Sequence, residues 1–284
     1  MNNTIFFGDD SNFSGKNLGS SMREKNILIV DSGNGGKYTL SLLRRVLPVE
    51  NFVYIEDNKN CPYGKKSKHR LKKICKDLLT SALKIYPAKM IVIACNTMSS
   101  VIDDKFKSKF KMPILTVTPK IKNYKKPTLV LCTSATRKYN KDIKNYLKSE
   151  NIKICDFKDL AKKIDENVEN LTLLQPYLDK KLKKYAKMNI RRVVLGCTHF
   201  NLIKTQIQNS LINNPIVPTP VTYKKVAKKS AQTLPIVLTN KKPDVIFYES
   251  SKDVALLALN TLKALSLQSK RKAGSVLYLK TQIE

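Results

Sequence analysis

The stretches MIVIACNT (residues 90–97) and RVVLGCTH (192–199) each run from a short apolar segment directly into a cysteine and small polar residues. Short runs of aliphatic and β-branched residues bounded by turn residues predict buried strands. A shift of 102 residues, from 90 to 192, aligns the two stretches, and the same shift places LVLCTS (129–134) on ILIVDS (27–32). Two aligned pairs at one offset predict two similar lobes; chance alignment of short apolar strands is the alternative.

Apolar runs alternate with segments of helical spacing along the chain. We expect strands at 26–30, 51–55, 89–94, 113–117, 128–132, 151–155 and 191–196, and helices at 38–46, 68–85, 138–149, 168–187 and 200–209. This alternation predicts an α/β fold of two pseudo-symmetric lobes, with mainly parallel sheets flanked by helices. Ligands of such sheets bind at the carboxyl ends of strands, so Cys95 and Cys197 are expected to face each other across a cleft.

The composition is that of a globular protein. The chain has 284 residues, 42% of them hydrophobic, with only 9 Gly and 12 Pro, which excludes collagen-like, linker and wholly disordered classes. It has no apolar stretch long enough for a membrane span and no secretory signal pattern, so we expect a cytoplasmic protein without a membrane partner. The six cysteines form no CxxC pair and only two histidines are present, so we expect free thiols and no bound metal.

The chain is strongly basic, with 53 Lys and Arg against 22 Asp and Glu and a net charge of +31. The excess is spread along the whole sequence, as solvated helix surfaces in a lysine-rich protein would show. The other interpretation is a nucleic-acid or acidic-protein partner, because binding to a polyanion needs clustered Lys and Arg.

The two strand-end cysteines are candidates for acid/base chemistry. Cys95 precedes Asn96-Thr97 and Cys197 precedes Thr198-His199. A thiol is mostly protonated at neutral pH, and a nearby cation or helix N-terminus is needed to favour the thiolate. His199 and the helix N-termini after the strands are candidate sources of that effect, whereas an inert buried cysteine is the structural alternative.

The loop DSGNGG (31–36) ends the first strand and opens a helix, but it matches neither GxGxxG nor the P-loop pattern. Its backbone N–H groups can still bind a carboxylate. Asp31 is expected either to assist a thiol or grip an ammonium group, or to cap the helix. A second turn-like loop, CPYG (61–64), is explained equally well by its Pro and Gly.

Four motifs, DSGNGG (31–36), EDNKNCPYG (56–64), ACNTMSS (94–100) and GCTHFNLI (196–203), resemble in order and spacing the glutamate racemases of the aspartate/glutamate racemase superfamily. The resemblance covers about residues 26–210. It implies a cofactor-independent isomerase that makes D-glutamate for bacterial peptidoglycan. It also implies two α/β lobes with the active site between them.

The resemblance makes Cys95 and Cys197 the acid/base thiols, with Asp31 and His199 as assisting groups. A further carboxylate in the second lobe corresponds to Asp165 or Glu166, and this choice stays open. The expected substrate-binding residues are Ser32, Pro62, Tyr63, Gly64, Asn96, Thr97, Thr136 and Thr198.

Some features depart from the family pattern or leave alternatives. Phe200-Asn201 stands where the family has Tyr-Pro, Val217 to Val221 lacks the usual Asp, and the basic C-terminal tail from 269 has no counterpart.

We expect a flexible extension (1–21), a first lobe (22–119 and 220–284) and a second lobe (120–219); the return to the first lobe and a homodimer are implied by the resemblance. The alternatives are a racemase of aspartate or another acidic amino acid, or a racemase scaffold that binds nucleic acid or an acidic protein.

Overall fold

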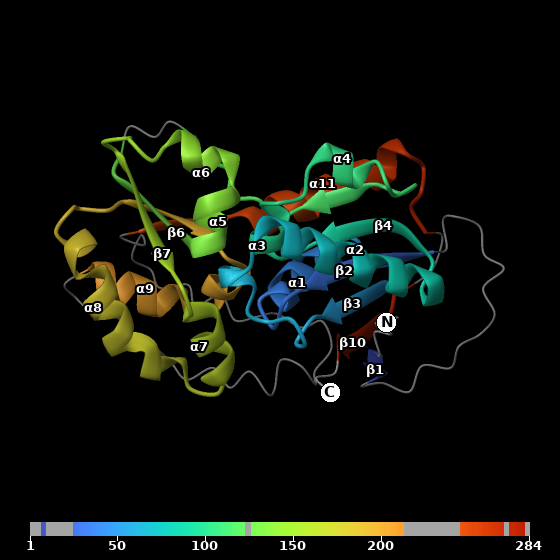
Figure 1. Ribbon diagram of the computed structural model, residues 1–284, viewed down its shortest axis with the longest axis horizontal. Helices are drawn as coiled ribbons and strands as arrows, with labels where there is room; N and C mark the ends of the chain where they lie inside the picture. Colours follow the sequence, from blue (N-terminus) through green and yellow to red (C-terminus); the bar gives the residue numbers. More distant parts are fainter. Residues whose placement is uncertain (1–6, 10–24, 123–125, 213–244, 270–272, 282–284) are drawn as a thin grey trace.

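Two mainly parallel sheets lie side by side in the computed structural model, which describes residues 7–9, 25–122, 126–212, 245–269 and 273–281 (Figure 1). The six-stranded sheet has the order β1 (Phe7–Asp9), β10 (Val276–Thr281), β3 (Phe52–Glu56), β2 (Asn26–Asp31), β4 (Ala88–Ile93) and β5 (Ile114–Thr116). The four-stranded sheet has the order β7 (Ile152–Phe157), β6 (Thr128–Thr133), β8 (Arg192–Gly196) and β9 (Ile246–Glu249). Among the strands that the structure describes, only β1 pairs in the antiparallel sense.

Helices cover both sheets. In the first lobe they are α1 (Gly36–Val46), η2 (Tyr63–Lys65), α2 (Lys68–Ile85), α3 (Asn96–Ser99), α4 (Asp104–Lys107) and α11 (Ser250–Ala264). In the second they are α5 (Ser134–Tyr139), α6 (Lys141–Asn145), α7 (Leu160–Glu166), η3 (Leu171–Leu174), α8 (Gln175–Ala186), η4 (Thr198–Ile203) and α9 (Lys204–Leu211). The longest, α2, begins where the Ser67 side chain accepts a hydrogen bond from the Arg70 N–H, and its apolar residues at helical spacing pack on the sheet.

The two lobes repeat one arrangement. In the first sheet β2 lies between β3 and β4, and in the second β6 lies between β7 and β8. The stretches that align at the 102-residue offset therefore occupy equivalent strands, β2 with β6 and β4 with β8. The prediction of two similar lobes is confirmed, and each cysteine of interest follows the same strand of its lobe.

All seven expected strands are present, within a few residues of the expected bounds. The expected helix 138–149 is instead α5 and α6, because the Asn140 side chain accepts a hydrogen bond from Ile143 N and caps a new helix. The expected helix 168–187 begins only with η3, and the preceding segment forms α7.

The C-terminal part of the chain differs most from expectation. We expected residues from 220 onward to belong to the first lobe, but β9 pairs with β8 in the second sheet, so the chain returns to the first lobe only with α11. The basic tail from 269 supplies β10, which pairs in parallel with β3. Within the expected flexible extension, residues 7–9 form β1 against β10. The expected boundaries at 22 and 220, and Val217 to Val221, lie outside the described residues.

Glu249, at the end of β9, joins the two lobes at this return. Its buried carboxylate accepts a hydrogen bond from the Tyr38 hydroxyl of α1 and pairs with Lys204 at the start of α9. Lys204 also lies over the Tyr38 ring, 5.0 Å from its centroid. One carboxylate thus connects α1, which follows the glycine-rich loop, with the start of α9, which follows Cys197 and η4.

A second buried ion pair fixes the C-terminal segment to the base of the first sheet. Lys89 Nζ lies 2.5 Å from Glu50 Oε2, with both side chains fully buried, and it donates to the Leu267 carbonyl at 2.8 Å. Glu50 accepts from the Ser269 N–H and hydroxyl, each at 2.9 Å. The pair therefore connects β4 with the segment that leads to β10.

Replacement of Lys89 by Met is expected to lower the free energy of unfolding by about 3–5 kcal/mol, because it leaves a buried carboxylate without its cation. Urea denaturation gives this value directly. The double variant Lys89→Met/Glu50→Leu, which removes both charges, is expected to recover most of the loss. Equal instability of the single and double variants would contradict the assignment.

No helix in the described ranges is long and apolar enough to cross a membrane. All six cysteines are free thiols.

Candidate active site

Cys95 lies at the end of β4, where the chain turns into α3, and is 5% exposed. Its sulfur is 3.6 Å from the Ser32 hydroxyl, which follows the neighbouring strand β2. Burial raises the pKa of Cys95 well above its ordinary value, and the negative charge of Asp31 raises it further. Cys95 is therefore a neutral thiol in this structure.

Cys197 occupies the equivalent position after β8 and has a different neighbour. Its sulfur lies 3.9 Å from Nδ1 of His199, whose Nε2 is 3.0 Å from Oδ2 of Asp165 on α7. Burial disfavours the charged imidazole, but the hydrogen bonds to Asp165 and Cys197 outweigh it and raise the pKa of His199 well above its usual range. Burial likewise opposes ionisation of Asp165, yet the bond from His199 lowers the pKa of that carboxyl. The charged imidazole of His199 thus faces the sulfur of Cys197.

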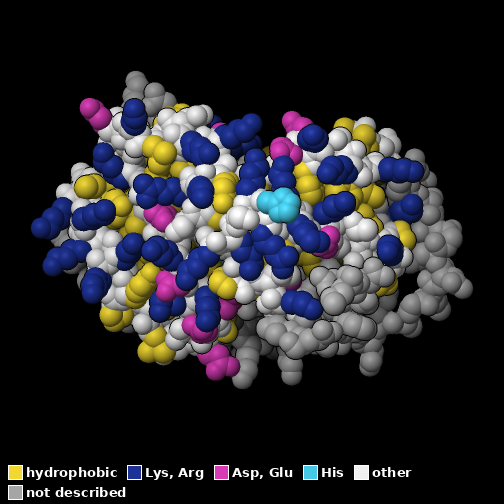
Figure 2. All heavy atoms as spheres, in the orientation of Figure 1, with side chains coloured by type: hydrophobic (Ala, Val, Ile, Leu, Met, Phe, Trp, Pro, Cys, Tyr) yellow, Lys and Arg dark blue, Asp and Glu magenta, His cyan; other side chains and the backbone are white. Residues whose placement is uncertain are grey.

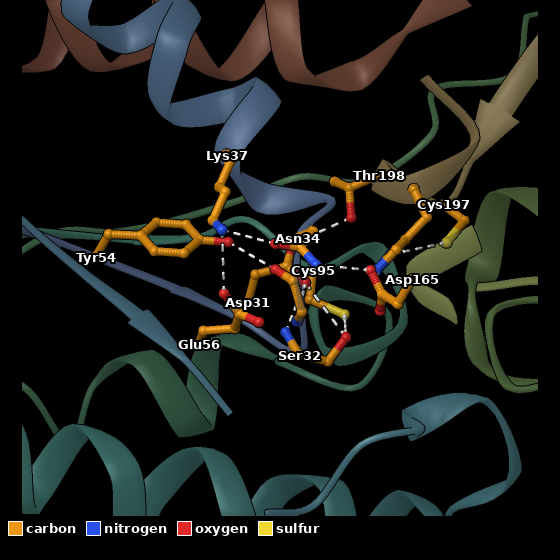
Figure 3. Close-up of polar contacts among 12 residues, drawn as sticks. Asp31, Ser32, Asn34, Lys37, Tyr54, Glu56, Cys95, Asp165, Cys197 and Thr198 are labelled. Carbon is orange, nitrogen blue, oxygen red and sulfur yellow. Dashed lines mark hydrogen bonds and ion pairs between the residues drawn. The ribbon is translucent and has the colours of Figure 1, made fainter. Parts of the chain in front are cut away.

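The two thiols belong to one site. The charge on Cys197 is among the influences that raise the pKa of Cys95. The lobes also exchange hydrogen bonds here, since the Thr198 hydroxyl donates to Asp31 Oδ2 at 3.0 Å. Figure 3 shows Asp31, Ser32 and Cys95 from the first lobe beside the second-lobe residues.

The glycines of the first loop permit this close approach. A Cβ on Gly33 would lie 2.8 Å from Oδ2 of Asp165, and one on Gly35 would lie 2.5 Å from the backbone N of His199. Neither position has room for a side chain, so the glycine-rich pattern lets the first loop lie against the His199–Asp165 pair.

Three threonine hydroxyls meet where strand ends of the two lobes come together. Thr97 Oγ1 lies 2.8 Å from that of Thr133 and 3.3 Å from that of Thr136, and the latter two are 2.9 Å apart. Thr97 and Thr136 were expected at the site, whereas Thr133 was not. The internal repeat held the signal for it, because Thr133 aligns with Asp31.

The remaining expected residues surround this centre with different contacts. Ser32 contacts the Cys95 thiol, and Thr198 donates to Asp31. The cis peptide bond Cys61-Pro62 precedes η2. Gly64 lies against Thr133 of the other lobe, and the Tyr63 hydroxyl donates to Asp57 at 2.5 Å. Asn96 uses its amide nitrogen to hold the Val117 carbonyl and the Ser250 hydroxyl, so part of its side chain serves the fold.

The two candidate carboxylates, Asp165 and Glu166, have different surroundings in the structure. Asp165 contacts His199, while Glu166 is exposed and pairs with Lys162 on the same helix at 3.5 Å. Sequence reasoning missed Asn34, whose amide bonds to Asp165, and Lys37, which bonds to Asn34. Both sit in the glycine-rich loop or the first turn after it, where nothing local indicates a contact with the other lobe.

Asp31 is buried where a carboxylate is costly. Its oxygens accept from the Ser32 N–H and the Thr198 hydroxyl, but desolvation outweighs these bonds and the charge of His199, and raises its pKa from 3.8 to about 6. The stability contributed by its protonated form is fully present below pH 3.8 and is lost as the pH rises through about 6.

An Asp31→Asn variant should remove this pH dependence while keeping the shape of the side chain and an acceptor oxygen for the Ser32 N–H; its amide nitrogen then donates to the Thr198 hydroxyl, which becomes the acceptor. Relative to the unsubstituted protein, its free energy of unfolding is expected to increase by about 2 kcal/mol between about pH 4 and pH 7.5. Urea denaturation of both proteins at the two pH values measures the change. A difference that is constant with pH would show that burial does not control this carboxyl.

Two similar α/β lobes that each bring a strand-end cysteine to a shared polar site define a two-lobed isomerase of the racemase class. The chain belongs to the Asp/Glu/hydantoin racemase family, whose pattern matches residues 37–225.

Named relatives agree with this membership. The chain is 34% identical over 200 residues to the glutamate racemase of Buchnera aphidicola subsp. Schizaphis graminum, covering 67% of this chain and 78% of the relative. It is 28% identical over 250 residues to the glutamate racemase of Clostridium acetobutylicum, covering 84% of this chain and 97% of the relative. The crystal structure of the Thermus thermophilus glutamate racemase with β-chloro-D-alanine has the same fold, with a TM-score of 0.70, 23% identity and coverage of 92% and 90%. The crystal structure of the Francisella tularensis glutamate racemase with D-glutamate has a TM-score of 0.67 and is 22% identical, with coverage of 92% of this chain and 90% of that one.

Proposed function

We propose that the protein interconverts L- and D-glutamate by proton transfer at Cα between Cys95 and Cys197, and so supplies D-glutamate for peptidoglycan synthesis in the cytoplasm. The observation that carries the proposal is the contrast between the two thiols. Cys95 is held neutral by burial and Asp31, while Cys197 faces the His199 imidazolium. A two-base reaction requires one thiol and one thiolate at the same time.

The repeated lobes suit a reaction that is almost mirror-symmetric. A thiolate at Cys197 removes the Cα proton from one face of the substrate, and the Cys95 thiol returns a proton to the opposite face. The other enantiomer is processed with the roles exchanged. Because the bases come from two lobes, the substrate does not have to turn over between the two steps.

The carbanion formed between these steps is stabilised by fixed donors. The hydroxyls of Thr97, Thr133 and Thr136 bond to one another in this structure, and a substrate carboxylate between the lobes would take the place of those contacts. Substrate entry thus requires Thr97 to separate from Thr133. Each tenfold in rate needs about 1.36 kcal/mol of preference for the transition state, which oriented donors in a water-poor site provide.

We propose glutamate rather than aspartate as the substrate, because relatives that match most of the chain are named glutamate racemases. Turnover of L- and D-glutamate and of L- and D-aspartate, measured side by side with the purified protein, tests this choice. Glutamate is expected to give the higher kcat/KM. Faster turnover of aspartate would assign the enzyme to the other acidic substrate, and no turnover of either would refute the racemase proposal.

Two partner predictions stay open to experiment. The expected homodimer is checked by light scattering during gel filtration. The basic surface, on which Lys and Arg predominate in Figure 2, is checked by salt-dependent binding to double-stranded DNA. No association at low salt would dispose of a nucleic-acid role.

A further inference from the structure

Asn34 connects the first lobe to the assisting groups of the second thiol. Its Nδ2 donates to Oδ1 of Asp165 at 3.1 Å, and its Oδ1 accepts from Nζ of Lys37 at 2.6 Å. Lys37 in turn lies 3.6 Å from Oε2 of Glu56, a buried carboxylate oxygen that accepts no hydrogen bond within the described residues. Figure 3 shows this series of contacts running from Glu56 to Asp165.

Lys37 determines which end of the amide faces Asp165. An ammonium group can only donate hydrogen bonds, so the oxygen of the Asn34 amide must be the end that faces Lys37. The nitrogen then points to Asp165. Without Lys37 the amide could turn and place its oxygen against the carboxylate, where both atoms would be acceptors.

Asn34 contacts the Asp165 carboxylate through its side chain and also through its backbone N–H, and only the side-chain bond is removed by substitution. Oδ1 accepts from Asn34, and Oδ2 pairs with Nε2 of His199. With Oδ1 occupied, the carboxylate is held in the rotation that directs Oδ2 at the imidazole. The imidazole then keeps Nδ1 toward the sulfur of Cys197.

The contacts between the lobes are reciprocal. Thr198 of the second lobe donates to Asp31 of the first, and Asn34 of the first lobe donates to Asp165 of the second. Each lobe therefore completes the hydrogen bonding of the other lobe's carboxylate. Both bonds exist only while the lobes are in contact.

We propose that Asn34 and Lys37 are positioning residues: Asn34 orients Asp165, and through it His199, toward Cys197, and Lys37 sets the orientation of the Asn34 amide. The inference rests on the proposed racemase function. Neither residue reaches the reacting atoms, and both act through Asp165.

Asn34→Ala and Asn34→Asp separate this role from a merely structural one. Asn34→Ala is expected to lower kcat/KM with glutamate by roughly tenfold or more, because it removes a donor to a charged group. Asn34→Asp places two carboxylates within hydrogen-bond distance, and such pairs retain a proton at unusually high pH. Once protonated, Asp at this position donates to Asp165 as the amide does.

The activity of Asn34→Asp relative to Asn34→Ala is therefore expected to rise about fivefold or more as the pH falls from about 8 to about 5.5. A ratio that does not change with pH, or an Asn34→Ala enzyme with normal activity, would overturn the proposal. Asn145→Asp makes the same change at an exposed position of α6 and serves as the matched control. All activities are read well below the thermal unfolding midpoint of each variant.

Other charged and titratable groups lie around Asp165, and their titration must be separated from the pH dependence of the Asn34→Asp to Asn34→Ala activity ratio. They are His199 from η4, Lys37 from α1, Tyr54 and Glu56 from β3, Asp31 after β2, Cys61 before η2, and Lys162, Lys163 and Glu166 on α7 itself. Burial raises the pKa of Cys61 to about 11 and that of Tyr54 well above its usual value, so neither ionises in this interval. The other groups titrate in both Asn34 variants, so their own titrations cancel in the ratio. The charge of Lys37 acts on the new carboxyl alone and lowers the pH at which that carboxyl takes up its proton.

Lys37 is tested by a double-mutant cycle. Lys37→Met is expected to lower kcat/KM several-fold in the parent enzyme and to have no effect in the Asn34→Ala background, while Lys37→Arg retains activity. Equal losses in both backgrounds would show that Lys37 does not act through Asn34. Lys76→Met, at an exposed position of α2, is the matched control.

A measurement without turnover separates this inference from the proposed function. The chain has two histidines, so the imidazole NMR signals of buried His199 and exposed His69 can be followed individually with pH. We expect an added titration step at His199 in Asn34→Asp that is missing from Asn34→Ala. If the step appears in Asn34→Asp but the parent protein does not racemise glutamate, the proposed function fails and the positioning role stands. If the parent enzyme is active and the step is missing, the positioning role is wrong.

Discussion

Replacement of either Cys95 or Cys197 by alanine is expected to lower kcat/KM for glutamate racemisation by about 10³-fold, within the range that a positioned acid or base contributes. Each variant lacks either the group that removes the Cα proton or the group that returns one. The two enantiomers are equally stable, so kcat/KM must fall by the same factor in both directions. Circular dichroism at a single wavelength follows the loss of optical activity from either enantiomer.

Cys75→Ala is the matched control for this pair. Cys75 is a buried thiol of α2 that packs in the core of the first lobe. Its replacement leaves a small cavity and no chemical change at the site, so turnover is expected to stay near normal. Retention of normal turnover by Cys95→Ala or Cys197→Ala would refute the assignment of the two bases.

The second large effect is expected from His199→Asn, which removes the imidazolium beside Cys197. Folding raises the pKa of His199 well above 6.5 through Asp165 and Cys197, so its charge is present at neutral pH and is lost only as the pH rises through that higher value. A thiol without an adjacent cation ionises near pH 8.5. We expect kcat/KM near pH 7 to fall about 10²-fold, with part of the activity recovered toward pH 9.

A pH–rate profile of His199→Asn measures both the loss and the recovery. His69→Asn makes the same substitution at the exposed histidine of α2 and should leave the profile unchanged. A uniform loss with no shift toward alkaline pH would mean that His199 acts by packing rather than by charge.

Short apolar strands made most of the fold predictable. Seven strands and the repeat relating β2 to β6 and β4 to β8 follow from runs such as MIVIA and RVVLG, which have few other stable arrangements. The C-terminal part was harder to assign. Strand β10 lies in a basic tail outside the four motifs, and β9 joins a sheet whose other strands lie far earlier in the sequence.

The site was predictable where it follows strand ends and unpredictable where it depends on contact between the lobes. Cys95, Cys197 and Asp31 each follow a buried strand, and the family motif marks His199. The bond from Asn34 to Asp165 spans 131 residues, and a lone Asn between glycines has an equally good local explanation as a turn residue. The choice of Asp165 over Glu166 likewise depends on which of the two neighbouring side chains faces His199.

Hydrogen isotope exchange in D₂O tests the two-thiol mechanism most directly. Starting from L-glutamate, the D-glutamate formed in early turnover is expected to carry deuterium at Cα, while the remaining L-glutamate keeps its hydrogen; the reverse should hold when D-glutamate is the substrate. This pattern arises because one thiolate removes hydrogen from one face and a separate, solvent-exchanged thiol delivers deuterium to the other. Early deuterium in the unreacted enantiomer at the same level as in the product would indicate a single base serving both faces, and would contradict the account.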